Sequence, residues 1–404
     1  MIELSTKSLF FACLIIVAPF LLRYRSRLRK TVFLALNVLV ITAASHSLLQ
    51  WVITVIWVML PYLLMHFWGS REKLKPFMIA GIVVIYVYLA KYGFVFSLLH
   101  LPEIFLFKIL GLSYFLFREI DYIMQYKSLK EEGYSLGCID YLNYILDFYT
   151  LMAGPILRYR EFVDDFYGSG EETGFIPITK KELLDDINRV INGYVKVYVI
   201  SAILDSWAKY WFDGLKDHDG FLKAAGAFCI FAFFNCWYIY FNFSGYCDIV
   251  IGAAGLSGMK IHENFNRPYM SVNVVEFWNR HHITLSEWIR DYIFTPFYKW
   301  LLSVPLKKKI LLAQCISLFV TFLVAGIWHG TTMDYVMYGL FQGLGIVVAT
   351  LWKTKRKKWL GKEKNKKYEN NPVVITVARI VTWGYICLTF TFTGYPVMSL
   401  FTGR

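Results

Sequence analysis

The sequence reads IHENFNRPYMSVNVVEFWNRHHITLSEWIRDYIFTPFYKW from Ile261 to Trp300, the most polar passage between two blocks of near-continuous hydrophobic sequence. It contains three of the eight histidines of the chain, among them His281 and His282. A second segment, AGIWHG from Ala325 to Gly330, places His329 at the end of an apolar run. We therefore expect a membrane protein with one buried site, around which His282 and His329 lie.

The composition indicates a membrane protein. Of 404 residues, 57% are hydrophobic and 19% are aromatic, whereas soluble domains are usually about 45–50% apolar. An apolar stretch of about 18 residues can cross a hydrocarbon core of ~30 Å. Candidate spans lie at about 8–22, 31–45, 48–68, 76–99, 103–124, 139–157, 187–212, 222–256, 283–302, 310–328, 333–352 and 373–400. The sequence predicts an all-α polytopic membrane protein with about 10–12 membrane segments, some of them re-entrant.

The net charge of +13 is explained by short basic runs between apolar segments, at Arg23–Lys30, Arg71–Lys75, Lys307–Lys309 and Lys353–Lys367. This distribution is typical of cytoplasmic loops, and it predicts that both termini lie on the outer side of the membrane. No basic patch is interleaved with stacking aromatics in a soluble segment, so we expect membrane lipids and no nucleic acid as partners.

We expect one membrane-embedded domain over residues 1–404, because the sequence contains no internal repeat and no soluble domain. The apolar stretch Leu9–Leu22 is typical of a first membrane helix rather than of a removed signal peptide. The seven cysteines are scattered and form no CxxC pair, which favours small buried hydrophobes over disulfides or zinc ligands. No HExxH motif is present, so no metal site is predicted.

The polar passage predicts an interfacial amphipathic helix over Val274–Trp288. We expect it to break near Ile283–Thr284, where Thr284 would cap the following helix together with Glu287. Adjacent residues on a helix lie about 100° apart. One of the two neighbouring histidines is therefore expected to face the site, while the other supports the backbone or faces a loop.

Single polar residues in apolar segments have two interpretations. A neutral imidazole such as that of His329 can take a proton from a hydroxyl group, or it can make a structural hydrogen bond. Asp248 is either a hydrogen-bonding contact between helices or a contact to substrate. The Gly154–Pro155 pair predicts a bend or a re-entrant tip, and it precedes Arg158.

Three motifs of the sequence resemble those of a known family. ENFNRPY followed by FWNRHHITLSEWIRDYIFTPF, the segment GIWHG at Gly326–Gly330, and LMAGPILRYREF at Leu151–Phe162 are similar to signatures of the membrane-bound O-acyltransferase family. They resemble in particular its bacterial branch of alginate O-acetyltransferases and teichoic acid D-alanyl transfer proteins. The motifs cover about 131–340. The resemblance implies a ring of membrane helices around a central acyl-transfer tunnel.

The resemblance also implies roles for residues. His329 aligns with the family's invariant histidine, which acts as a base or assists acyl transfer. His282 aligns with the other essential histidine, in a W-x-R-x-H pattern formed by Trp278, Arg280 and His282. His281 stands where tryptophan is usual, and a register slip of one residue would exchange the roles of the two histidines. The substrate-binding candidates are Trp278, Asn279, Arg280, His281, Asp248 and Arg158.

The function implied is that of an O-acyltransferase of class EC 2.3.1. It would move an acyl group from a cytoplasmic thioester, acetyl-CoA or an acyl or D-alanyl carrier protein, toward hydroxyls of a cell-envelope or extracellular polysaccharide. An extracytoplasmic partner protein is expected, and no tightly bound cofactor. Acetyl is preferred on the AGPI and ENFNRPY motifs, whereas the chain length and WNR are nearer to D-alanyl transfer. A transporter of a lipid-linked or acylated substrate is the alternative from another class.

Overall fold

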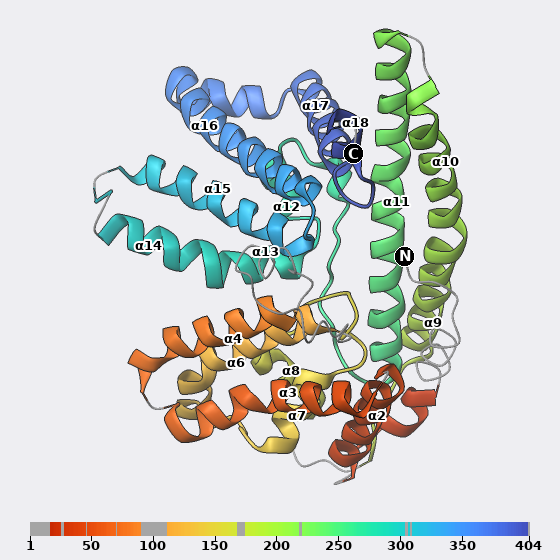
Figure 1. Cartoon of the computed structure of the whole chain (residues 1–404), viewed down its shortest axis with the longest axis vertical. Helices are drawn as coiled ribbons and strands as arrows, with labels where there is room; N and C mark the ends of the chain where they lie inside the picture. Colours follow the sequence, from red (N-terminus) through yellow and green to blue (C-terminus); the bar gives the residue numbers. More distant parts are fainter. Residues whose placement is uncertain are drawn as a thin grey trace. The chain divides into compact units, whose positions relative to one another are not determined.

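The computed structural model describes residues 17–25, 28–45, 47–69, 71–89, 111–167, 174–217, 220–303, 306–307 and 309–402. Helices dominate the described chain (Figure 1), which confirms the predicted all-α class. The described strands are β1 (Tyr24–Arg25) and β2 (Gly174–Phe175), which pair antiparallel with Tyr24 opposite Phe175.

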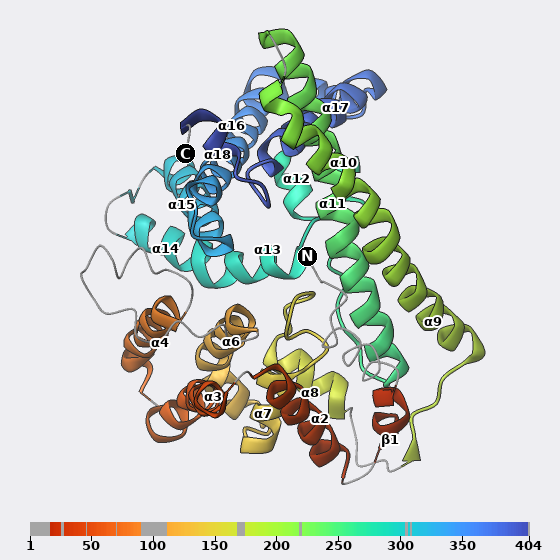
Figure 2. The same cartoon turned by 45° about the vertical axis from the view of Figure 1, so that its right-hand side comes forward.

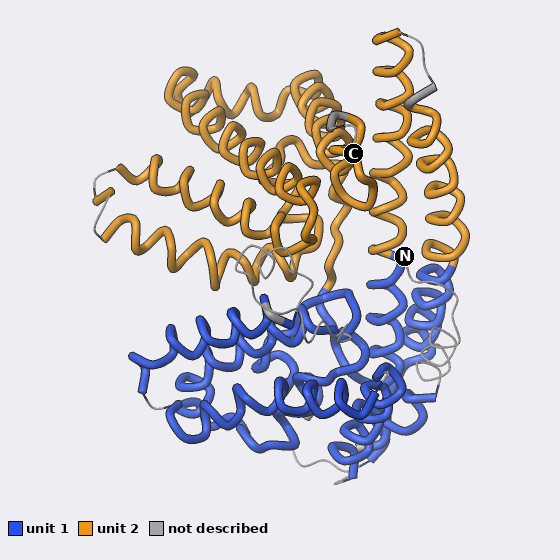
Figure 3. The backbone as a smooth tube through the Cα atoms, viewed as in Figure 1, with its two compact units in different colours: residues 1–194, 245–262 blue, residues 195–244, 263–404 orange. Residues whose placement is uncertain are grey.

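Two compact units are formed (Figure 3). Unit 1 contains Met1–Tyr194 and Gly245–His262, and unit 2 contains Val195–Ser244 and Glu263–Arg404. One continuous helix, α11 (Phe221–Leu256), contributes residues to both units. The single domain over residues 1–404 stays a prediction.

Five described helices are long and apolar enough to cross a membrane: α3 (Leu48–Trp68), α11, α15 (Ile310–His329), α16 (Met333–Glu369) and α17 (Pro372–Phe390). They confirm an α-helical polytopic membrane protein. Most of the candidate span 8–22, and parts of 76–99 and 103–124, lie outside the described residues. The total of about 10–12 segments therefore stays a prediction.

Unit 1 is built from helices that pack around buried arginines. Its further helices are α2 (Arg29–Ala44), α4 (Lys75–Leu89), α6 (Leu112–Glu131), α7 (Cys138–Leu146), α8 (Tyr159–Tyr167) and α9 (Lys180–Val195), with a 3₁₀ turn at Glu72–Leu74. Arg23 and Arg29 are only 7% and 4% exposed. Arg23 donates to the carbonyl oxygens of Ile176 at 2.9 Å and Leu256 at 2.7 Å. These two arginines of the predicted loop run therefore hold unit 1 together instead of facing solvent.

The candidate span 139–157 is interrupted, as the Gly154–Pro155 pair predicts. Helix α7 ends at Leu146, and no helix forms again before α8. Gly154 has a φ of 104°, in the left-handed region that glycine tolerates best, and its carbonyl oxygen accepts a hydrogen bond from the Tyr114 hydroxyl at 3.1 Å.

The turn after α7 depends on a buried ion pair, and we expect Arg118→Met to destabilise the protein by about 3–5 kcal/mol. Arg118 and Asp147 are both fully buried, with 3.7 Å between Nη2 and Oδ2, and Arg118 also donates to the carbonyl oxygens of Tyr144 and Ile145. The variant leaves an uncompensated charge on Asp147. Thermal unfolding in detergent measures the effect, and the double variant Arg118→Met with Asp147→Asn is expected to recover part of it. Equal midpoints for the wild type and the single variant would contradict the assignment.

Unit 2 contains the polar passage and the carboxyl-terminal helices. Its further helices are α10 (Ser201–Asp213), α12 (Val274–Trp278), α13 (Ile283–Ile289), α14 (Thr295–Ser303) and α18 (Val397–Thr402), with π turns at Lys196–Ile200 and Arg290–Phe294 and 3₁₀ turns at Gly214–Asp217 and Pro268–Met270. Helices α15 and α16 pack side by side, and α14 packs on α15 (Figure 2). A core cluster that includes Trp278, Phe322, Tyr338 and Phe390 links α12 to α15, α16 and α17.

Helices α15 and α16 approach closely at two glycines, so Gly326→Val is expected to destabilise unit 2 by about 1–3 kcal/mol. A Cβ atom at Gly326 would overlap the backbone of Gly339, which cannot move aside as a flexible side chain can. Gly384 of α17 has open space around it, and Gly384→Val is the matched control. Thermal unfolding of both variants checks the prediction, which fails if the two midpoints fall equally.

Helices α16 and α17 differ in length from the spans that the sequence predicts. Helix α16 continues past residue 352 to Glu369 through a kink at Gly361, where φ is 68°. Arg356 stabilises the kinked end, because its Nε donates to Asn365 at 2.9 Å and its Nη2 pairs with Glu369. The predicted span 373–400 is also too long, because α17 ends at Phe390 and a turn separates it from α18.

Candidate functional site

The candidate site is built on a break between two short helices. Asn273 caps α12, accepting a hydrogen bond from the backbone N–H of Glu276 at 2.9 Å. Helix α12 ends at Trp278 and α13 begins at Ile283, which confirms a break in the predicted amphipathic helix. The predicted cap by Thr284 is wrong: Thr284 lies inside the first turn of α13, and its hydroxyl donates to Asn264 Oδ1 at 3.0 Å.

Backbone pairing holds the break in place. The N–H of Asn266 donates to the carbonyl oxygen of Arg280 at 2.9 Å, and the N–H of Ile283 donates to that of Asn264 at 3.0 Å. His282 has a φ of 49°, a left-handed conformation that costs about 1–3 kcal/mol in a non-glycine residue and that recurs at functional sites. Because the helix breaks here, His281 and His282 are both buried, at 4% and 5% exposure.

Asn264 determines which nitrogen of His282 carries the proton. Its Oδ1 accepts from the backbone N–H of Thr284 at 3.2 Å, a group that can only donate, so this atom is the amide oxygen. The same oxygen lies 3.3 Å from His282 Nδ1, which must therefore be the protonated nitrogen. In the neutral ring Nε2 then carries the lone pair, and it can accept a proton or a hydrogen bond.

His281 lies among aromatic rings. Its ring centroid is 4.9 Å from that of Phe277, 4.9 Å from that of Phe265 and 5.5 Å from that of Phe390. Its Nδ1 is buried and has no hydrogen-bond partner among the described residues. Burial lowers the pKa of His281 to about 3, so the ring is neutral and packs as a wall residue.

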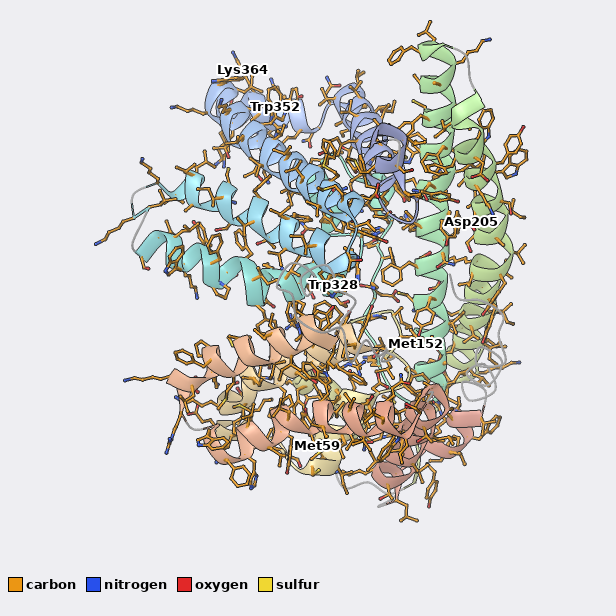
Figure 4. All side chains as sticks on the ribbon, viewed as in Figure 1. Met59, Met152, Asp205, Trp328, Trp352 and Lys364 are labelled. Atoms are coloured by element: carbon orange, nitrogen blue, oxygen red, sulfur yellow. The ribbon has the colours of Figure 1, made fainter. Side chains whose placement is uncertain are left out.

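His329 ends α15, beside Trp328, which Figure 4 labels, with 4.5 Å between the ring centroids. Its ring is also 5.6 Å from that of Tyr338. Unlike His281 and His282, His329 is exposed. Burial lowers the pKa of His282, and the rings of His281 and His329 lower it further. The rings of Phe390 and Tyr338, whose centroids are 5.8 Å apart, lie between His281 and His329 and contact one each.

The other candidates next to the break differ in accessibility. Trp278 is buried, and its Nε1 donates to Gln342 Oε1 at 3.1 Å. Asn279 is exposed. Arg280 pairs with Glu276 at 2.8 Å, and both side chains are about one-third exposed. Roles for these residues in substrate binding stay predictions.

Asp248 and Arg158 belong to unit 1, whereas the histidines of the site belong to unit 2. Asp248 pairs with Arg189 at 3.1 Å. Arg158 pairs with the fully buried Asp121, also at 3.1 Å. Both ion pairs are contacts between segments of unit 1, and roles of Asp248 and Arg158 toward substrate stay predictions.

Sequence reasoning missed two polar supports of the site. Asn264 lies in the quoted ENFNRPY motif, and its place in that motif was a usable signal. Gln342 lies on α16 and donates to Thr389 Oγ1 at 2.6 Å while it accepts from Trp278, and nothing local in the sequence indicates it. Among the described residues, no group of three or more His, Cys, Asp or Glu side chains could hold a metal ion.

Removing the Asn264 carbonyl is expected to lower the reaction rate of the site about tenfold, because a net hydrogen bond of ~1–1.5 kcal/mol no longer fixes the His282 tautomer. Asn264→Ala makes this change, and Asn264→Asp keeps an acceptor and is expected to retain activity. The Asp variant should also move the acid limb of the pH–rate profile upward, since a carboxylate favours the imidazolium. An unchanged rate in Asn264→Ala would contradict the positioning role.

Comparison with known proteins gives consistent matches. Residues 38–391 match the model of the membrane-bound O-acyltransferase family. The chain is 30% identical over 307 residues to the teichoic acid D-alanyltransferase of Bacillus subtilis (strain 168), covering 74% of this chain and 71% of that relative. It is 31% identical over 240 residues to the probable alginate O-acetylase AlgI of Pseudomonas aeruginosa, covering 59% of this chain and 42% of that relative.

Proposed function

Because the chain belongs to the membrane-bound O-acyltransferase family and is thus an O-acyltransferase, we propose that it carries an acyl group across a bacterial cytoplasmic membrane. The donor is a cytoplasmic thioester, and the acceptors are hydroxyls of a cell-envelope or extracellular polysaccharide. The observation that supports this proposal is the helix break, at which the His282 imidazole is buried and Asn264 fixes its tautomer.

The proposed chemistry is attack of a hydroxyl on a thioester. His329, which is exposed, takes the proton as the hydroxyl oxygen forms its bond to the acyl carbon. The carbon–sulfur bond then breaks, and the thiolate receives the proton from the His329 imidazolium. His282 Nε2 offers an acceptor that orients the hydroxyl group. Positioning and a neutral base together favour transfer to the acceptor over hydrolysis.

Acetyl is the acyl group that we propose first, from the AGPI and ENFNRPY motifs. D-alanyl is the second candidate, because the match to a D-alanyltransferase covers 71% of that relative, against 42% for the alginate O-acetylase. The donor is accordingly acetyl-CoA or a D-alanyl carrier protein. In either case we propose an extracytoplasmic partner protein that completes transfer to the polymer, and an orientation with both termini outside.

Donor identity is tested with isotope-labelled thioesters. The full chain in native membranes is given labelled acetyl-CoA or a labelled D-alanyl carrier protein at the cytoplasmic face, and label in the envelope polymer is counted. Label from one donor identifies the acyl group. A transporter without acyl chemistry would not take label from a thioester; it would move only compounds that another enzyme had already acylated. Absence of transfer from both donors would contradict the proposal.

A further inference from the structure

An apolar groove of about 670 Å³ runs between α16 and α17 in unit 2. Its walls include Val348 and Trp352 of α16 and Val377 and Val381 of α17, and the start of α12 contributes Val274. Trp352 and Val377 are 48% and 54% exposed. The groove is thus open and apolar, it lies on membrane helices, and it is separate from the histidine site.

The length of the groove fits one leaflet. Its wall on α16 extends from Phe341 to Trp352, which corresponds to about 16 Å at a rise of ~1.5 Å per residue. Half of a hydrocarbon core of ~30 Å is about 15 Å. A single extended acyl chain of a membrane lipid therefore matches this groove in length. An acyl chain forms no hydrogen bonds, which suits the apolar wall of the groove.

One end of the groove carries dense positive charge. Tyr368 and Trp352 line this end, and Arg356 lies 4.8 Å from the Tyr368 ring centroid. The lysines beside them are exposed and form no ion pair among the described residues: Lys353, Lys355, Lys357, Lys358, Lys362, Lys364, Lys366 and Lys367. Figure 4 labels Trp352 and Lys364 at the same end of α16. Aromatic rings beside lysines are typical of a membrane–water interface.

We propose that this groove binds one acyl chain of an anionic glycerophospholipid, whose headgroup rests on the basic end of α16. The apolar wall alone would accept any lipid chain. The lysines select a negative headgroup, because each Lys near an anionic lipid contributes ~1 kcal/mol. Val274 and Asn273 in the groove belong to the start of α12, and Arg379 of α17 donates to the carbonyl oxygen of Met270 at 3.0 Å. The bound lipid therefore contacts the helix that leads into the catalytic break.

Quenching of Trp352 fluorescence tests the proposal without any need for acyl transfer. The full chain is placed in phosphatidylcholine nanodiscs with increasing fractions of phosphatidylglycerol that has dibrominated acyl chains. The Trp352 signal is the difference between the wild type and Trp352→Phe. Half-maximal quenching is expected at about a fivefold lower fraction of brominated phosphatidylglycerol than of brominated phosphatidylcholine.

Matched variants separate the groove from the charge. Val377→Phe fills the groove and is expected to abolish Trp352 quenching, whereas Ile380→Phe, on the same helix but outside the groove, retains it. Changing Lys353, Lys355 and Lys357 together to Gln should raise the half-maximal fraction of brominated phosphatidylglycerol toward that of brominated phosphatidylcholine. The control variant, in which Lys299, Lys307 and Lys309 are changed to Gln, should leave this half-maximal fraction unaltered. Equal quenching by both brominated lipids would overturn the headgroup preference, and no quenching of Trp352 by either would show that another occupant fills the groove.

Discussion

Replacing His329 with alanine is expected to lower acyl transfer by about 10²–10⁴-fold, the usual contribution of a general base. His329 is the exposed imidazole of the site, and its substitution removes the group that we assign to the acceptor proton. The rate of label transfer from the thioester in reconstituted membranes measures the effect. Because the ring is accessible and ends its helix, the variant is expected to fold and insert as the wild type does.

A second histidine provides the control for His329. His262 has a side chain that is 59% exposed, and it lies in unit 1 at 3.6 Å from Glu161. We expect His262→Ala to keep wild-type activity. If His329→Ala transferred label as fast as His262→Ala at the same level of folded protein, His329 would not be the base.

Replacing His282 is expected to have the second largest effect, a loss of about 10²-fold or more. His282→Asn is the suitable variant, because asparagine tolerates the left-handed backbone at this position, while the ring nitrogen Nε2 is lost. Burial lowers the pKa of His282 below its ordinary value of 6.5. The His282 ring therefore stays neutral at pH values at which a free histidine is protonated. Activity of the wild type should accordingly persist below pH 6.5.

His281 tests whether the register of the two adjacent histidines is right. Its ring packs against Phe277 and Phe265, so His281→Phe is expected to preserve most of the activity. Transfer rates of His281→Phe and His282→Asn are compared in the same preparation. The opposite order of effects would assign the functional role to His281.

Local patterns explain what the sequence predicted well. Polar residues between apolar ones at Val274–Trp288 indicated a broken amphipathic helix, and Gly154–Pro155 indicated an interrupted span. The apolar run before His329 indicated a membrane helix, and α15 has nearly the predicted limits. Each of these features depends on residues within one or two helical turns.

Long-range contacts explain what the sequence did not predict. Arg23 resembles a cytoplasmic loop residue, but its bonds reach carbonyl groups more than a hundred positions away. Thr284 has the spacing of a helix cap, yet its hydroxyl donates a hydrogen bond to Asn264, which comes earlier in the chain. Helix α16 kinks at Gly361, and the side chains that Arg356 binds lie beyond the kink. Such partners can be identified only once the tertiary contacts are known.

The most direct test of the account uses sealed inverted membrane vesicles from cells that make this protein, in which the cytoplasmic face is outside and the envelope polymer is inside. A labelled, membrane-impermeant thioester is added to the outside, and label on the enclosed polymer is measured for wild type and His329→Ala. We predict label on hydroxyl groups of the enclosed polymer in wild-type vesicles and its loss in the variant. Label that stays outside, or that reaches the polymer equally in both, would contradict transfer across the membrane at this site.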